Sequence, residues 1–275
     1  MALIDQIYGI VLGSHMIPEW LLFGAVFMFG LLMGSFINVC IYRLPREESV
    51  VFPASHCPSC NQTIRPYDNV PLLSYLLLRG RCRSCRGVIP WRYPLIELLH
   101  GLGALFLVGK FGFSLTAAAY GFFMAACVAV IFIDLAHQII PDEITLLGIG
   151  VGIVASATVL PTGWVDAITG LLLGGGLFYL IAMLSEIVLK KEGMGGGDIK
   201  FIAMIGAFLG WQNMLLTILL ASLSGSVVGL IRMRLKGYSR SEPIPFGPFL
   251  SVGACFALLW GETISNWYVN MAYSP

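Results

Sequence analysis

Long apolar runs separated by short polar segments make up most of the chain. A helix needs about 20 apolar residues to cross a bilayer, and the pattern predicts eight such spans. The second and the sixth are short, and the boundary between the sixth and the seventh, near residues 211–214, is the least distinct. The predicted spans are residues 20–41, 94–110, 114–136, 143–160, 165–189, 199–212, 214–231 and 245–266. The pattern therefore predicts an all-α polytopic membrane protein.

Composition supports this prediction. The 275 residues are 57% hydrophobic and only 11% charged, whereas about 25% of the residues of a soluble domain are charged. The net charge of +1 excludes a strongly basic nucleic-acid binder, so we expect membrane lipid and no nucleic acid around the chain. No Lys or Arg precedes Arg43. The N-terminus lacks the basic region of a cleavable signal peptide, and we expect the first span to remain as an anchor.

The basic residues predict the orientation. Eight arginines lie within residues 43–92, and the loops after the fifth and seventh spans carry most of the others. Eight spans place 15 of the 16 basic residues on one side, with only Lys110 opposite. Because Lys and Arg accumulate in cytoplasmic loops, that side is predicted to be cytoplasmic. The basic residues in the later loops and at the start of the sixth span are Lys190, Lys191, Lys200, Arg232, Arg234, Lys236 and Arg240.

Residues 43–92 form the one long polar segment, and they divide the chain into three parts. We expect an N-terminal region with the first helix (1–42), a cytoplasmic insert (43–92) and a helical core (93–275). The insert is too small for an ordinary hydrophobic core, so it needs a cross-link.

Four cysteines in the insert form two pairs of the type Cys-x-x-Cys. Cys57 and Cys60 are followed after 21 residues by Cys82 and Cys85. This spacing is close to that of zinc ribbons and predicts a structural Cys₄ zinc site. His56 could replace a cysteine as a ligand. A redox pair or disulfides are the alternative, but a cytoplasmic location disfavours structural disulfides.

Two acids lie at the ends of predicted spans. Asp134 is near the end of the third span, and Asp198 follows three glycines at the start of the sixth. Each alone is explained by an interfacial or capping role. Together they lie on the predicted cytoplasmic side at the same depth. Two adjacent carboxyl groups share a proton, which would allow them to activate water and hydrolyse a peptide bond. Gly195 and Gly197 would give the supporting loop its freedom.

Other acids and other functions compete with this interpretation. Glu97 and His100 are one turn apart, but a second such pair for a metal is missing. Asp142, after Pro141, is predicted to be an N-cap. A transporter could use intramembrane carboxylates, although these acids lie at one surface and not near the midplane. A non-catalytic assembly scaffold with a zinc module is the other alternative.

The order of several short motifs resembles the bacterial type IV prepilin peptidases, a GxGD-type family of membrane aspartic proteases, over nearly the whole chain. The motifs are Gly34-Ser-Phe-Ile-Asn-Val39, Arg43-Leu-Pro45, the two cysteine pairs, Arg79-Gly-Arg-Cys82, Arg92-Tyr-Pro-Leu-Ile-Glu97, Asp134 with Asp142, Gly195-Gly-Gly-Asp198 and Pro243-Ile-Pro-Phe-Gly-Pro248.

This resemblance implies a function. It implies catalytic aspartates at Asp134 and Asp198, and cleavage of type IV prepilins and type II secretion pseudopilins at the cytoplasmic face of the inner membrane. The cut would follow a glycine between a basic leader and a hydrophobic helix. The resemblance also implies N-methylation of the new N-terminus with S-adenosylmethionine. No strand–GxGxxG–helix unit occurs in the sequence, so the methylation site is inferred from the resemblance alone. It implies the cytoplasmic segment and its junction with the second span, where Glu97 is a candidate.

Overall fold

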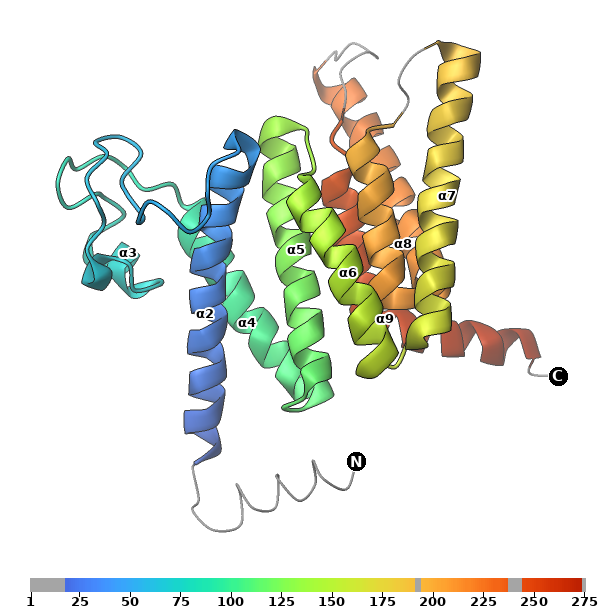
Figure 1. Cartoon of the computed structure of the whole chain (residues 1–275), viewed down its shortest axis with the longest axis horizontal. Coiled ribbons are helices and arrows are strands. Elements are labelled where there is room, and N and C mark those ends of the chain that lie inside the picture. Colours follow the sequence, from blue (N-terminus) through green and yellow to red (C-terminus); the bar gives the residue numbers. More distant parts are fainter. Residues whose placement is uncertain (1–17, 191–193, 237–243, 274–275) are drawn as a thin grey trace. The chain divides into compact units, whose positions relative to one another are not determined.

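A computed structural model describes residues 18–190, 194–236 and 244–273. The described residues are helical and contain no strand beyond two isolated bridges. The elements are α2 (Glu19–Arg43), η1 (Leu44–Arg46), η2 (Pro66–Asp68), α3 (Leu73–Leu77), α4 (Arg92–Phe111), α5 (Leu115–His137), α6 (Asp142–Thr158), α7 (Gly163–Leu189), α8 (Gly196–Lys236) and α9 (Gly247–Tyr273). Figure 1 shows their course. Lys191, Arg240 and Pro243 lie outside the described residues.

The helices belong to two compact units. Unit 1 comprises the described residues up to Phe36 together with Ser55–Gly112, and unit 2 comprises Ile37–Ala54 and the described residues from Phe113 on. The boundary falls inside α2, so this helix contributes to both. In unit 1, α2 and α4 approach closely at glycines. A Cβ added to Gly34 would lie 2.6 Å from the Cα of Glu97, so only a residue without a side chain allows this contact.

The long helix α8 is a hairpin of two helical segments. Gly210 has φ 75° and ψ 174° and interrupts the helix. A Cβ at Gly174 of α7 would lie 3.2 Å from the carbonyl oxygen of Ile202 and 3.2 Å from the sulfur of Met214. In a straight helix these two residues would be about 18 Å apart. The chain therefore reverses at Gly210, and Figure 1 shows both ends of α8 at the same end of unit 2.

The first segment of α8 forms the centre of the unit 2 core. Phe201, Ile202, Met204, Ile205 and Phe208 are all fully buried. Glycines of α6 make room for the larger of these side chains, because the sulfur of Met204 and the ring of Phe208 occupy the Cβ positions of α6 glycines. The ring of Phe208 also packs on Phe123 of α5, with 4.9 Å between the ring centroids. This packing fixes the start of α8 against α5, α6 and α7.

Six helices of the described residues are long and apolar enough to cross a membrane. Two elements account for the difference from the eight predicted spans. Helix α6 has only 17 residues, and α8 counts once although it contains both the sixth and the seventh predicted spans. The break lies at Gly210, just before the predicted boundary. The all-helical membrane fold is confirmed, and the number of spans stays a prediction.

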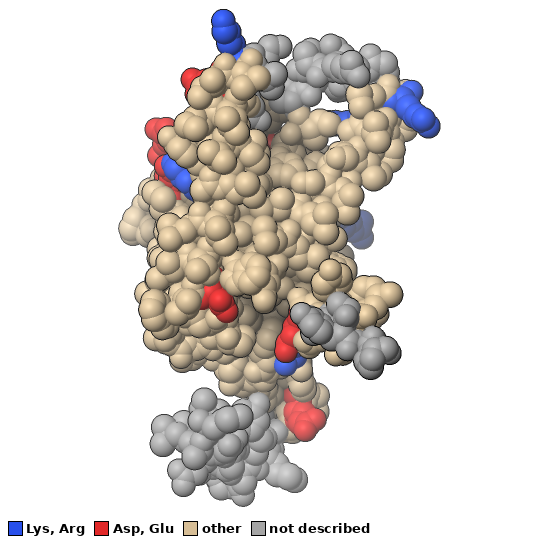
Figure 2. All heavy atoms as spheres, turned by 90° about the vertical axis from the view of Figure 1, so that its right-hand side faces the viewer, with Lys and Arg blue, Asp and Glu red and all other residues tan. Residues whose placement is uncertain are grey.

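The surface of unit 2 supports a membrane location. Helix α7 is 27 residues long and carries charged residues only near its two ends, at Asp166 and Glu186. Most of its large apolar side chains are exposed, among them Leu172 and Tyr179 at 63%. Figure 2 shows that charged side chains are sparse on this side of the molecule. Exposed apolar surface of this extent is stable where lipid, and not water, is the solvent.

Candidate active site and metal site

Asp134 lies one turn before the end of α5 and is buried, with 5% of its surface exposed. Its Oδ2 accepts a hydrogen bond of 2.9 Å from the backbone N–H of Gly247, the first residue of α9. A buried carboxylate is costly unless a donor satisfies it, and this N–H is such a donor. A Cβ at Gly247 would lie 2.7 Å from the same oxygen. Glycine is therefore required at this position for α9 to hold Asp134.

Asp198 stands in the first turn of α8 and is half-buried. Its backbone N–H bonds to the carbonyl oxygen of Gly195 at 3.1 Å. The helix begins at Gly196, so Asp198 is inside the first turn and is not the N-cap. Its side chain is consequently not needed to cap the helix and is available for another role.

Ile140 links the two acids. A Cβ at Gly197 would lie 2.9 Å from the Cβ of Ile140, and a Cβ at Gly247 would lie 3.2 Å from its Cδ1. Gly197, which precedes Asp198, and Gly247, which donates to Asp134, thus both pack on the side chain of Ile140. The two carboxyl groups interact electrostatically. The structure brings Asp134 and Asp198 together at the end of unit 2 where α5 ends and α6 and α8 begin, at the upper edge of Figure 1.

Asp142 is near this site but forms a different interaction. Both of its carboxylate oxygens accept hydrogen bonds of 2.7 Å from the Nζ of Lys200. The N-cap of α6 is Pro141 and not Asp142, so the prediction of a capping role was wrong. The reason is that Asp142 already has helical backbone geometry and its side chain reaches across to α8. The pair joins the first turns of α6 and α8, and both side chains are 40% or more exposed.

The two cysteine pairs form two turns with the same hydrogen bonds. The N–H of Cys57 bonds to the carbonyl oxygen of Gln62, and the N–H of Asn61 bonds to that of Cys57. In the second turn the N–H of Cys82 bonds to Gly87, and that of Arg86 bonds to Cys82. Asn61 and Arg86 both have left-handed backbones, with φ of 55° and 60°. Each turn therefore presents its two sulfurs in the same way.

The four sulfurs converge. All lie within 4.8 Å of one another, and the sulfurs of Cys57 and Cys85 are 3.9 Å apart. The cysteines form no disulfide. Zn–S bonds of about 2.3 Å in a tetrahedron place sulfurs about 3.8 Å apart. The cluster of Cys57, Cys60, Cys82 and Cys85 could therefore hold a metal ion, and its donor set and spacing fit zinc.

Backbone donors favour the thiolate at one of these cysteines. Hydrogen bonds from the backbone of Cys85 and Ser84 lower the pKa of Cys82 to about 7. The pKa of Cys60 is raised to about 11, because desolvation and the neighbouring thiols of Cys85 and Cys57 outweigh a hydrogen bond from the backbone of Gln62. A divalent cation would remove this repulsion between neighbouring sulfurs, because ligating thiols are deprotonated.

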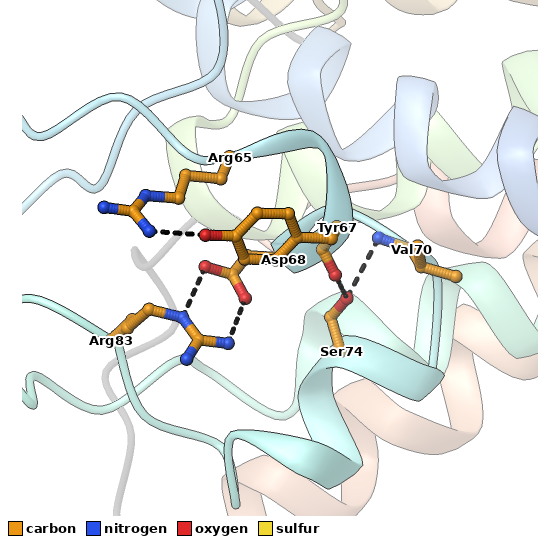
Figure 3. Close-up of polar contacts among 6 residues, drawn as sticks. All are labelled: Arg65, Tyr67, Asp68, Val70, Ser74 and Arg83. Atoms are coloured by element: carbon orange, nitrogen blue, oxygen red, sulfur yellow. Dashed lines mark hydrogen bonds and ion pairs between the residues drawn. The ribbon is translucent and has the colours of Figure 1, made fainter.

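A polar bridge joins the segment between the two cysteine turns to the second turn (Figure 3). The guanidinium of Arg83, between Cys82 and Cys85, donates to both oxygens of Asp68, from Nε at 2.8 Å and from Nη2 at 2.6 Å. This contact lowers the pKa of Asp68. The guanidinium of Arg83 also lies 5.5 Å from the ring centroid of Tyr67. The bridge holds the segment between the turns against the second turn.

Glu97 is buried in unit 1, where its carboxylate is already engaged. Its Oε2 accepts a hydrogen bond of 2.8 Å from the backbone N–H of Leu72, and the Ser35 hydroxyl forms a second hydrogen bond to the carboxylate. This arrangement ties the insert to α4. The carboxylate keeps further acceptor positions, so the predicted role of Glu97 in methylation stays a prediction.

Sequence analysis did not identify the roles of Gly247, Ile140 and the Lys200–Asp142 pair. Gly247 stood within a motif of the resemblance but had no role assigned, and its contact with Asp134 joins residues 113 positions apart. The sequence signal that could have identified Gly247 is its position between Phe246 and a proline, at the start of an apolar run.

Two family models and several known proteins match most of the chain. Residues 28–111 match the bacterial peptidase A24 N-terminal domain, and residues 121–230 match the type IV leader peptidase family. A protein of Pseudomonas aeruginosa named prepilin leader peptidase/N-methyltransferase is 38% identical over 268 residues, which cover 89% of this chain and 92% of that relative. A protein of the same name from Aeromonas hydrophila is 38% identical over 284 residues, 94% and 97% of the two chains. No solved structure matches the chain.

Proposed function

Because the chain belongs to the type IV leader peptidase family, we propose that it removes the leader peptide of type IV prepilins and methylates the new N-terminus. The relatives from both organisms carry the name of this bifunctional enzyme. We extend the substrates to the pseudopilins of type II secretion, since their leaders have the same chemistry in the resemblance described above.

The observation that carries the peptidase proposal is the pairing of Asp134 and Asp198 at one end of unit 2. They come from helices far apart in the sequence, and Ile140 and Gly247 bring them together. The adjacent acid Asp142 is already paired with Lys200. Asp134 and Asp198 are therefore the two carboxyl groups that we assign to catalysis, with Gly195 and Gly197 shaping the loop before Asp198.

The proposed reaction is direct hydrolysis by water held between the two carboxyl groups. A hydrogen bond from an N–H stabilises the ionised form of a carboxyl group, so we assign the base to Asp134. It takes a proton from water while Asp198 gives a proton to the carbonyl oxygen of the scissile bond. The tetrahedral intermediate then collapses and the C–N bond breaks. The leaving amine receives the proton held by Asp134, and Asp198 takes back a proton from one hydroxyl of the intermediate, so both carboxyl groups return to their starting states. No covalent intermediate is formed.

We propose that this reaction takes place at the cytoplasmic face of the inner membrane. Positive charge supports this orientation, because the insert and the loops at the same end of the predicted topology carry most of the Lys and Arg. A prepilin leader that stays in the cytoplasm would meet the two aspartates at that surface. We keep the division into residues 1–42, 43–92 and 93–275 for the anchor, the insert and the peptidase core.

For the insert we propose a structural zinc ion bound by Cys57, Cys60, Cys82 and Cys85. Four thiolates leave no open position for water or substrate, so the ion would stabilise the fold of the insert. The bridge between Asp68 and Arg83 adds to this cross-link.

For the second activity we propose S-adenosylmethionine as the methyl donor, which supplies an electrophilic methyl group for the amine. The described residues do not assign its site. Glu97 stays the candidate for this site, with a carboxylate that Leu72 and Ser35 already hold in place. We therefore derive no step through the donor.

The proposal is tested with the purified full chain in lipid nanodiscs and a full-length prepilin. Mass spectrometry should detect loss of the leader in every reaction, and the gain of one methyl group only when S-adenosylmethionine is added. Cleavage without methylation would remove the second activity. Absence of both activities in folded protein would favour a transporter or a scaffold.

A further inference from the structure

The short helix α3 of the insert has its apolar side outward. Leu73, Leu76 and Leu77 follow one another at the spacing i, i+3 and i+4, which places them on one face of a helix. They are 53%, 70% and 72% exposed. A helix that packs on a soluble domain buries this stripe. Here the apolar stripe is the outer face.

The other face of α3 is fixed within the insert. Ser74 is 7% exposed, and its hydroxyl donates to the carbonyl oxygen of Tyr67 and accepts from the N–H of Val70, both at 3.0 Å. Figure 3 shows this side chain turned toward Tyr67 and Val70. These bonds set the rotation of the helix about its axis. The leucines are therefore held outward by the fold of the insert.

The position of α3 along α4 says what covers the leucines. The residue before α3, Leu72, donates its N–H to Oε2 of Glu97 at 2.8 Å. Glu97 is five residues into α4, or about 7.5 Å along the helix axis from Arg92. Trp91, at the start of that helix, is 70% exposed, and exposed tryptophans mark the membrane–water interface. Because a helical side chain tilts toward the start of its helix, Oε2 of Glu97 and the start of α3 lie near the level of Trp91, at the interface that it indicates.

Charge on the same segment fits a lipid surface. Arg79 and Arg81 directly follow the apolar stripe, and both are exposed. Amphipathic helices that lie in the interface bury their apolar face about 5–10 Å into the boundary between headgroups and acyl chains. Basic side chains beside such a face contact the phosphates of anionic lipids.

We propose that α3 lies in the cytoplasmic lipid interface, with Leu73, Leu76 and Leu77 in the acyl region and Arg79 and Arg81 at the headgroup phosphates. The insert is then docked on the bilayer through α3 as well as through α4. Its partner at this surface is the anionic membrane lipid, in direct continuity with the lipid around α4. This inference depends on the membrane location of α4 and not on the peptidase assignment.

The test places a photoreactive benzoylphenylalanine at Leu76, or at the exposed Gln62 as the matched control in the same insert. The full chain is reconstituted in nanodiscs of phosphatidylethanolamine and phosphatidylglycerol, illuminated, and analysed by mass spectrometry. We expect lipid adducts at position 76 and none at position 62. Equal lipid labelling at the two positions, or none at position 76, would overturn the proposal.

A second arm separates lipid from substrate. The same reconstitution receives a prepilin before illumination. If α3 is a lipid anchor, the lipid adducts at position 76 persist. If prepilin adducts replace them, the leucines form a docking surface for the hydrophobic segment of the substrate, and the proposal is wrong. Neither result requires an active enzyme.

Discussion

The backbone N–H of Gly247 donates to Oδ2 of Asp134 over 2.9 Å, and the position of the missing Cβ lies 2.7 Å from that oxygen. The start of α9 therefore both holds and closely covers one of the two proposed catalytic carboxyl groups. This contact fixes which oxygen of Asp134 remains available to water. It makes Gly247 a positioning residue for the cleavage reaction.

Replacing Gly247 by alanine should displace Asp134 and lower kcat for cleavage by roughly 100-fold, the cost of misplacing a catalytic group by about 1 Å. The KM for prepilin should stay near the wild-type value. Steady-state cleavage kinetics measure both. Methylation of an already cleaved pilin is the internal control for folding, and Gly176→Ala, where the added Cβ meets nothing within 4 Å, is the matched substitution. Wild-type kcat in Gly247→Ala would contradict the role.

The first turn of α8 offers a matched pair of neighbouring glycines before Asp198. A Cβ at Gly197 would lie 2.9 Å from the Cβ of Ile140, whereas a Cβ at Gly196 meets nothing within 4 Å. Gly197→Ala should push Asp198 away from Asp134 and strongly reduce cleavage, while Gly196→Ala should retain it. Initial cleavage rates of the two purified variants decide this. Equal activity in both would show that the Ile140 contact does not position Asp198.

Asp142 separates the proposed dyad from acids that are merely nearby. Its ion pair with Lys200 is at least 40% exposed on both sides, and exposed pairs contribute little to stability. Asp142→Asn and Lys200→Met should therefore keep the cleavage rate within about tenfold of the wild type. Loss of a catalytic acid should lower that rate far more, by about 10²–10⁴-fold. A loss in Asp142→Asn as large as in Asp134→Asn would place Asp142 in the catalytic group.

The cysteine cluster predicts about one zinc ion per chain, which elemental analysis of the purified protein measures. Cys57→Ser should lose the ion, and residues 55–89 should then exchange backbone hydrogen with solvent faster, because the two turns depend on the ligands. Cys127→Ser, outside the cluster, is the control and should keep the metal. Protein with no zinc and with disulfides among the four cysteines would refute the site.

The sequence predicted the features that depend on local order. The apolar runs predicted an all-α membrane fold, and the motif order predicted the family; both are confirmed. The spacing of Cys57, Cys60, Cys82 and Cys85 was sufficient because each turn is short and self-contained. Asp134 and Asp198 were chosen as candidates from their places at the ends of apolar runs, and their catalytic role stays a prediction.

Features that depend on contacts between distant segments could not be read in this way. The hydrogen bond from Gly247 joins α9 to α5, and nothing in an apolar run marks which backbone N–H reaches which carboxylate. Gly210 reverses the chain in the middle of α8, yet it resembles any packing glycine in the sequence. The apolar residues of α3 are too few for a membrane span, so the apolar pattern did not predict this helix.

The central claim is that Asp134 and Asp198 together activate water. Asparagine keeps the size of the side chain but cannot take up or give a proton in this way, so Asp134→Asn and Asp198→Asn should each lower the rate of leader removal by about 10²–10⁴-fold. Mass spectrometry of a prepilin incubated with each purified variant measures this most directly, with methylation of an already cleaved pilin as the control for folding. Cleavage at a rate near that of the wild type in either variant would contradict the account.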